Sequence, residues 1–344
     1  MSRCPAVSND CENQMTTALD NWTIQTFSTL VRRILMPAAR QHLNILIFHR
    51  VRPARDPLFP GEPDRIEFDR CMRMVAENFN CLPLEQAMEM LSKRQNLPKN
   101  AVAITFDDGY ADNRTEAMPI LQRHGLTATF FVASGFLDGG CMWNDEAIEL
   151  VRNFPGDTMD LQPLGLEVLP SSTIAERADL LECLLSSLKY REPEERRSAL
   201  DSLRTITGGT IPRDLMMTRA QVREMRDAGM GIGGHTIGHP ILARIDAQHA
   251  RREIGEDRER LAGILGKAPR LFAYPNGKPG RDYLPEHPKM IKETGYDAAF
   301  STAWGTVTPD TDVYQVPRFT PWDKSPLRFA LRLTHNYMRT TPCA

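Results

Sequence analysis

Two short runs of the sequence bring together residue types that could bind a metal ion and activate water. Asp107 and Asp108 are neighbours in TFDDG, and His235 and His239 lie four residues apart in HTIGH. This spacing lets two imidazoles reach one cation, and Pro240 disfavours a helical His239, which places the pair on a strand-to-loop turn. Two imidazoles and one carboxylate, with positions left for water and substrate, form an open site suited to Zn²⁺ or a similar borderline cation.

Each of these runs follows a predicted strand. The apolar residues 101–106 precede the two aspartates, residues 230–234 precede His235, and residues 44–48 precede a further polar residue, His49. Asp-Asp-Gly alone is a common turn, and His-x-x-x-His alone is an equally weak signal. Because both runs follow strands of one alternating series and together supply a ligand set with one spare carboxylate, the sequence predicts a metal site.

Strands and helices alternate along most of the chain, which predicts an α/β fold. Polar residues after the strands are typical of a parallel barrel whose site lies at the carboxyl ends of its strands. Between residues 134 and 217 the alternation stops and helical spacing dominates, which predicts an inserted cap. The expected parts are an N-terminal extension with an amphipathic helix (1–43), a first barrel part (44–133), a helical insertion or cap (134–217), a second barrel part (218–325) and a C-terminal tail (326–344).

The spacing of apolar residues predicts the individual elements. Strands are expected at 44–48, 101–106, 127–132, 230–234, 270–274, 297–301 and 313–319, and helices at 67–79, 84–91, 113–124, 175–188, 194–203, 218–229, 246–265 and 288–294. Thr218 and Gln221 have the spacing of a capping box at the start of one of these helices.

Composition and charge argue against several classes of protein. The chain has 344 residues and a formal net charge of −2, which gives no broad footprint for nucleic acid. Its seven cysteines are scattered and none forms a C-x-x-C pair, so a cytoplasmic protein is expected rather than a disulfide framework or a zinc finger. No secretory signal or membrane span is visible. The amphipathic segment 23–39 is expected to dock on the domain or to make peripheral contact with the inner membrane face.

Three motifs resemble those of the polysaccharide deacetylases, the NodB-like carbohydrate esterases. They are TFDDG at 105–109, HTIGH at 235–239 and FAYPNG at 272–277, and the likeness covers roughly residues 44–320. The resemblance implies a distorted (β/α)7 barrel of NodB type, here with a helical insertion. It also implies metal-dependent removal of N- or O-acetyl groups from sugars.

The resemblance assigns roles to individual residues. It makes Asp107 the general base and makes Asp108, His235 and His239 the ligands of a divalent metal, with zinc expected and cobalt or nickel as alternatives. It also places a backbone N–H donor for the oxyanion at Asn276 in the third motif.

Two departures from the family pattern concern the base and the acid. Ala273 stands where the arginine of Arg-x-Pro-x-Gly is usual, and Arg318 in VPRF is expected either to replace it or to pair with a structural carboxylate. The late Leu-x-His pattern is also missing, since only His335 lies in that region. The run NILIFHRV instead resembles the first strand of the circularly permuted poly-N-acetylglucosamine deacetylases. That likeness makes His49 the general acid, and the alternative is a histidine hydrogen-bonded at the barrel rim.

Three aromatic residues near these motifs are expected to contact substrate: Tyr110, Trp143 and Tyr274. Trp143 begins the insertion and could stack on a sugar ring, although burial in the cap would explain the residue equally well. Tyr110 directly follows the aspartate run, and Tyr274 lies inside the third motif.

Together these observations predict a metal-dependent hydrolase that removes N-acetyl groups from an N-acetylated sugar or a lipid- or nucleotide-linked glycan intermediate. The expected partner is an acetylated carbohydrate or glycolipid, and the sequence indicates no oligomeric state. Two alternatives remain open, namely an amidase that acts on a non-sugar substrate and a carbohydrate-binding relic without activity. The intact set of Asp107, Asp108, His235 and His239 argues against the relic.

Overall fold

The structure is a computed structural model and describes residues 42–320 and 325–337. A parallel sheet curls around the centre of the molecule in the order β1-β3-β4-β7-β8-β9, and the short β2 pairs with the start of β3. These strands are β1 (Leu43–Phe48), β2 (Asn80–Cys81), β3 (Ala101–Phe106), β4 (Thr129–Val132), β7 (Gly231–Gly234), β8 (Leu271–Ala273) and β9 (Ala298–Phe300). Every residue of β1 and β3 is buried, as expected for strands covered on both faces.

A short segment closes the sheet into a barrel. Val316 forms a parallel bridge with Phe300 of β9, and Phe319 forms one with Leu46 of β1. The predicted strand at 313–319 is therefore reduced to isolated bridges, yet it joins the first and last strands of the sheet. The predicted distorted (β/α)7 barrel is confirmed.

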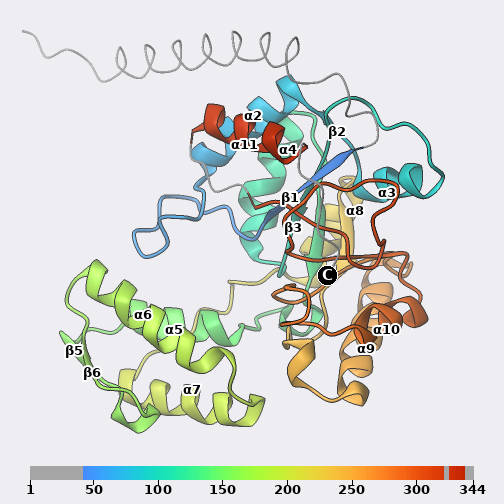
Figure 1. The fold of residues 1–344 in the computed structure, drawn as a ribbon. Helices are drawn as coiled ribbons and strands as arrows, with labels where there is room; N and C mark the ends of the chain where they lie inside the picture. The colour runs from blue at the N-terminus through green and yellow to red at the C-terminus, as the bar shows by residue number, and fades with distance from the viewer. Residues whose placement is uncertain (1–41, 321–324, 338–344) are drawn as a thin grey trace, which may run out of the picture.

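Helices cover the outside of the barrel, with α2, α4 and α11 on one side and α8, α9 and α10 on the other (Figure 1). Alternate strand residues point inward, such as Ile45 and Phe131, or outward against these helices, such as Leu46 and Phe130. The helices are α2 (Arg65–Asn78), α3 (Leu84–Ser92), α4 (Met118–Arg123), α8 (Arg219–Asp227), α9 (Ala247–Leu265), α10 (Glu286–Thr294) and α11 (Pro326–Asn336), with short 3₁₀ turns at Ser134–Phe136, Gln162–Leu164 and Leu242–Arg244.

One predicted helix and the predicted C-terminal tail differ from the structure. The helix expected at 113–124 begins with a π-helical turn, Asn113–Ala117, before α4. The segment predicted as a tail contains α11, whose residues Phe329 and Leu333 are buried. Their spacing of four residues puts both on one face of the helix, which packs beside α2.

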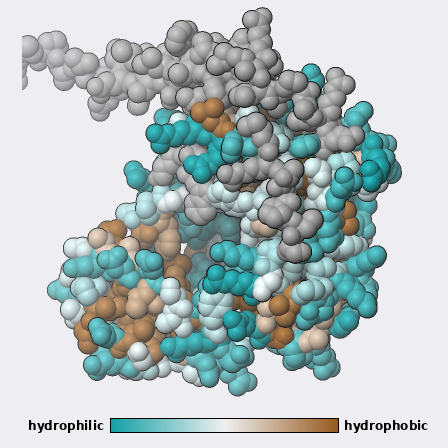
Figure 2. All heavy atoms as spheres, viewed as in Figure 1, coloured by the Kyte–Doolittle hydropathy of each residue, from teal (hydrophilic) through white to brown (hydrophobic). Residues whose placement is uncertain are grey.

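The insertion forms a separate lobe, seen at the lower left of Figure 1. It consists of α5 (Trp143–Arg152), the hairpin β5 (Thr158–Asp160) and β6 (Val168–Pro170), α6 (Ile174–Lys189) and α7 (Pro193–Thr207). Its own core includes Leu150, Leu184 and Leu203. In Figure 2 this lobe shows more hydrophobic surface than the rest of the same face. We call this lobe the cap.

No helix among the described residues is long and apolar enough to cross a membrane. The amphipathic helix predicted in the N-terminal extension lies outside those residues. Its membrane contact and the cytoplasmic location both stay predictions.

Candidate active site and metal centre

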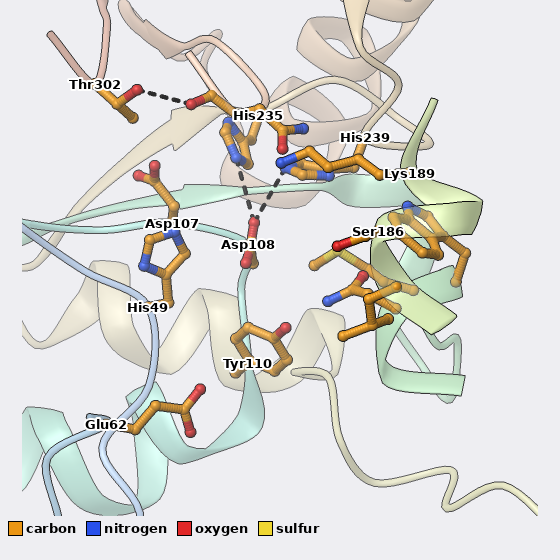
Figure 3. Close-up of a pocket in the computed structure, with 15 residues that line it drawn as sticks. His49, Glu62, Asp107, Asp108, Tyr110, Ser186, Lys189, His235, His239 and Thr302 are labelled. Carbon is orange, nitrogen blue, oxygen red and sulfur yellow. Dashed lines mark hydrogen bonds and ion pairs between the residues drawn. The ribbon is translucent and has the colours of Figure 1, made fainter. Parts of the chain in front are cut away.

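A cavity of about 380 Å³ lies between the carboxyl ends of the barrel strands and the cap (Figure 3). This volume falls in the range of small-molecule sites. Eight of the residues singled out in the sequence line it, and Arg318 and Tyr274 do not. The eight are His49, Asp107, Asp108, Tyr110, Trp143, His235, His239 and Asn276.

Three of these side chains converge as a ligand set would. One donor atom each from Asp108, His235 and His239 lies within 4.8 Å of the others, and Asp108 Oδ1 is 3.3 Å from Nε2 of both histidines. Bonds of ~2.0–2.1 Å in a tetrahedral site place neighbouring ligands ~3.3 Å apart. Asp108 Oδ1 is also buried without a hydrogen-bond partner among the described atoms. The residues present therefore fit a divalent metal.

The tautomer of His235 suits this role. Its Nδ1 lies 2.7 Å from the carbonyl oxygen of Ala273. A carbonyl oxygen only accepts, so Nδ1 carries the proton and the lone pair of Nε2 faces Asp108. The main-chain N–H of His235 donates to the buried carboxyl of Asp257 at 3.1 Å. The ring and its backbone are both held in place.

The histidine pair lies on a loop after β7, as predicted from Pro240. Thr236 and His239 have φ of 67° and 52° in this loop. Glu253 of α9 accepts from the N–H groups of Ile237 and Gly238 at 2.9 and 2.8 Å. A carboxylate on the neighbouring helix therefore fixes the turn that brings the second imidazole back to Asp108.

A tight turn after β3 separates the two aspartates. Asp108 and Gly109 have φ of 76° and 89°, so the backbone reverses and the two carboxylates take different environments. A Cβ on Gly109 would lie 3.0 Å from Val132 Cγ1, and the positive φ would strain any other residue there. The requirement for glycine in this motif is thus local and steric.

Asp107 pairs with Arg318 inside the barrel. The two terminal nitrogens of Arg318 donate to the two oxygens of Asp107, each at 2.7 Å, and Arg318 Nε donates to the carbonyl of Ser301 at 3.0 Å. Burial alone would raise the pKa of Asp107, but the charge of Arg318 and its hydrogen bonds outweigh burial and hold this pKa below its ordinary value. Arg318 thus contacts the carboxylate that an arginine at position 273 would orient in the usual family pattern.

His49 follows β1 and stands on the wall of the cavity beside Asp107 (Figure 3). The Asn113 side chain, at the start of the π-helical turn, donates to the His49 carbonyl at 2.8 Å. The ring of His49 remains exposed while its backbone is fixed.

The loop after β8 presents Asn276 at the cavity. Asn276 has φ of 58°, and its carbonyl accepts from Thr302 Oγ1 at 2.8 Å. A Cβ on Gly277 would lie 2.9 Å from the Thr302 nitrogen, so this loop packs closely against the segment after β9. The backbone at Asn276 is thereby held rigidly at the rim.

Tyr110 lies on the barrel wall of the cavity. Its hydroxyl donates to Asp145 at 3.0 Å, and the guanidinium of Arg50 lies 4.3 Å from its ring centroid. Burial raises the pKa of Asp145 to about 7. Tyr110 is therefore fixed by contacts from the barrel and from α5 of the cap.

Trp143 and Tyr274 have different surroundings. Trp143 lines the cavity from the cap, with Arg196 5.0 Å above its ring. The prediction that Tyr274 contacts substrate is wrong, because this side chain is fully buried. Its ring stacks on that of Tyr283 with 3.8 Å between the centroids, and its hydroxyl donates to the Tyr314 carbonyl. Alternation along the strand explains the error, because Tyr274 points outward with Phe272.

Several residues of the site carried no signal in the sequence. Glu253 and Asp257 lie on a highly charged helix, where nothing distinguishes them from surface carboxylates. Burial raises the pKa of Asp257 to about 8. Spacing along the chain gave no sign that this side chain turns toward β7.

Comparison with known proteins identifies a family domain in this chain. A sequence model described as "Polysaccharide deacetylase" matches residues 94–158 and 202–299. The chain carries a polysaccharide deacetylase domain. The two matched segments contain Asp107, Asp108, His235 and His239, and they leave out residues 159–201 of the cap. The protein is accordingly a hydrolase of the class that acts on carbon–nitrogen amide bonds.

The deacetylase domain also has relatives of known sequence and structure. A putative polysaccharide deacetylase of Bacillus subtilis, YxkH, is 21% identical over 277 residues, which cover 80% of this chain and 70% of the relative. The Streptococcus pyogenes deacetylase PplD, solved with acetate, superimposes with a TM-score of 0.57 at 19% identity, over 85% and 98% of the two chains. IcaB from Ammonifex degensii gives 0.52 at 20%, over 84% and 96%. At these identities the two structures bear on the fold alone.

Proposed function

We propose that this deacetylase is a metal-dependent enzyme that releases acetate from the N-acetyl group of a sugar or glycan intermediate. The observation that supports it is the convergence of Asp108, His235 and His239 on one point of the cavity, with Asp107 beside them and paired to Arg318. This arrangement separates an ion-binding carboxylate from a proton-accepting one.

Asp108, His235 and His239 would hold the ion through one carboxylate oxygen and two Nε2 atoms. When bound, a divalent metal there lowers the pKa of water and polarises the acyl oxygen. Zinc suits two imidazoles and one carboxylate, and cobalt or nickel would fit the same donors.

The remaining residues handle protons and charge. Asp107 stays ionised because Arg318 holds its pKa low, so it can accept the proton of the attacking water. His49, which lines the cavity beside Asp107, would donate a proton to the leaving nitrogen. The N–H of Asn276 would donate to the oxyanion, since the rigid loop presents that part of the backbone to the cavity.

The cap would bind the sugar. Trp143 lines the cavity and is partly buried against the core of the cap, and the part of its ring that reaches the cavity would pack on a sugar ring. Tyr110 lines the same cavity but its hydroxyl is committed to Asp145, so its ring edge rather than its O–H would contact substrate. The cap and barrel would thus hold opposite sides of one sugar unit.

Metal titration combined with an acetate-release assay on N-acetylhexosamines tests the proposal. Asp107→Asn should keep the metal and abolish turnover, whereas His235→Ala should lose both. Equal metal loss in the two variants would contradict the division of labour between the aspartates. Metal binding without acetate release from any N-acetylated sugar would favour an amidase that acts on another substrate.

A further inference from the structure

Three cations surround a single aromatic ring where the cap meets the barrel. The ring of Tyr190, just after α6, has Lys189 Nζ at 5.8 Å from its centroid, Arg244 Cζ at 5.5 Å and Arg281 Cζ at 5.1 Å. Lys189 belongs to the cap, whereas Arg244 and Arg281 belong to the loops after β7 and β8. Three separate segments therefore bring positive charge to one place.

The cluster has little negative charge of its own. Lys278 is a fourth cation, close enough for its charge to affect Lys189. None of the four forms an ion pair within residues 42–320 and 325–337. Burial lowers the pKa of Lys189, the carboxylate of Asp282 opposes this, and the charges of Lys278 and Arg281 lower it further. Asp282 is buried and accepts from the Lys278 main-chain N–H, so it offsets only part of the charge.

The cluster reaches the active-site cavity through Lys189. Lys189 lines that cavity, and it is the one lysine or arginine among the described residues that do so. Asn276 lines it too and lies on the same loop as Lys278 and Arg281. Figure 3 shows Lys189 on the cap side, facing the end of the cavity where Asp108 and the histidines lie.

Like charges this close repel one another, and cation–π contact with Tyr190 compensates only partly, because such contacts are weak where solvent reaches them. Arg244, Lys278 and Arg281 are exposed and their donors are open to a ligand. Guanidinium and ammonium groups together are typical of phosphate recognition. An anion would satisfy donors that the protein leaves without a carboxylate.

We propose that Lys189, Arg244, Lys278 and Arg281 form an anion subsite that binds a phosphate or diphosphate attached to the N-acetylated sugar. The inference rests on the proposed deacetylation, because the subsite selects among substrates of that reaction. With the acetamido group at Asp108 and the histidines, the phosphate of the same sugar would lie toward the cap. The substrate class is a sugar phosphate ester, whether free, nucleotide-linked or lipid-linked.

Steady-state kinetics on paired substrates test the subsite. An N-acetylhexosamine and its 1-phosphate are compared in the metal-loaded protein, in the Lys189→Gln/Arg281→Gln double variant and in Lys292→Gln. Lys292 is an exposed lysine on α10, so Lys292→Gln controls for the loss of a single positive charge outside the cluster. The wild type should prefer the phosphate by about tenfold or more in kcat/KM, and the double variant should lose most of that preference while Lys292→Gln keeps it. No preference in the wild type, or an equal preference in all three proteins, would overturn the subsite.

Calorimetric binding of the 1-phosphate to Asp107→Asn gives a readout that needs no turnover. Affinity should fall with added salt and should fall again when Arg244→Gln, a change at an exposed residue, is introduced. If affinity falls with salt and with Arg244→Gln, but the wild type releases acetate from no substrate, the subsite stands and the proposed reaction fails. If neutral and phosphorylated sugars are deacetylated equally and binding ignores salt, the reaction stands and the subsite fails. Nucleoside diphosphate and polyprenyl diphosphate sugars then distinguish the two linked sources.

Discussion

Substitution of Arg318 by methionine tests whether a buried ion pair orients the proposed base. Arg318 is fully buried and donates to both oxygens of Asp107 at 2.7 Å, to the Ser301 carbonyl at 3.0 Å and to Thr105 Oγ1 at 3.3 Å. Methionine keeps the unbranched apolar stem of arginine but has neither the guanidinium nor its charge, so the carboxylate would stay buried without its partner. Removing one member of such a pair typically lowers the free energy of unfolding by about 3–5 kcal/mol.

The loss of unfolding free energy in Arg318→Met should depend on pH, and the pKa of Asp107 sets its direction. The folded pKa of Asp107 lies below its ordinary value, so the pair contributes stability above the ordinary carboxyl pKa and loses it as pH falls through the folded value. The deficit of Arg318→Met should therefore be largest near neutral pH and smallest in acid. In the variant, burial acts on Asp107 without the guanidinium and raises its pKa, so the acid limb of kcat/KM should move to higher pH.

Urea unfolding across pH and a kcat/KM profile measure both effects. The double variant Asp107→Asn/Arg318→Met should lose less stability than the sum of the single variants, because the second change removes a charge that the first left unpaired. Single-variant losses that add within about 0.5 kcal/mol, together with an unmoved acid limb, would refute the orienting role of Arg318.

Three further changes have expected outcomes. His49→Ala should reduce kcat strongly with little change in KM if the ring protonates the leaving nitrogen, and full activity in steady-state assays would remove it from the mechanism. Chelation of the metal should lower Tm in scanning calorimetry, since an ion present at 1,000 times its Kd stabilises the fold by about 4 kcal/mol; unchanged melting would count against the site. Asp145 has a pKa raised by burial to about 7, so its protonated form is favoured in the fold and wild-type stability should fall as pH rises from about 4 to 7. Asp145→Asn should escape that fall, which amounts to about 4 kcal/mol at most, and parallel unfolding curves for the two proteins would contradict the shift.

Local patterns predicted the elements that carry the site. The apolar runs at β1 and β3 identified strands buried on both faces, because a strand covered on both faces has no solvent-facing positions for polar side chains. The capping box of Thr218 and Gln221 is formed as predicted, since it depends on residues three apart. Residues directly after the strands line the cavity because the carboxyl ends of the strands in a parallel barrel meet on one face.

Contacts between distant segments were beyond such patterns. The apolar pattern predicted a strand at 313–319, but barrel closure rests only on isolated bridges at Val316 and Phe319, and their partners in β9 and β1 lie too far along the chain for a local pattern to identify. The helix α5 was missed because it begins at Trp143 without a side-chain cap. Which carboxylates of α9 turn inward depends on how that helix packs, so Asp257 could be found only in three dimensions.

The pairing of Asp107 with Arg318 joins residues 211 positions apart in the chain. During synthesis at about 5–20 residues per second, roughly 10–40 s pass between the appearance of the two residues at the ribosome. A nascent chain that already contains both aspartates and both histidines still lacks the guanidinium that fixes the carboxylate. The enzyme is therefore expected to stay inactive during translation and to gain hydrolytic competence only when the last segment of the barrel is in place.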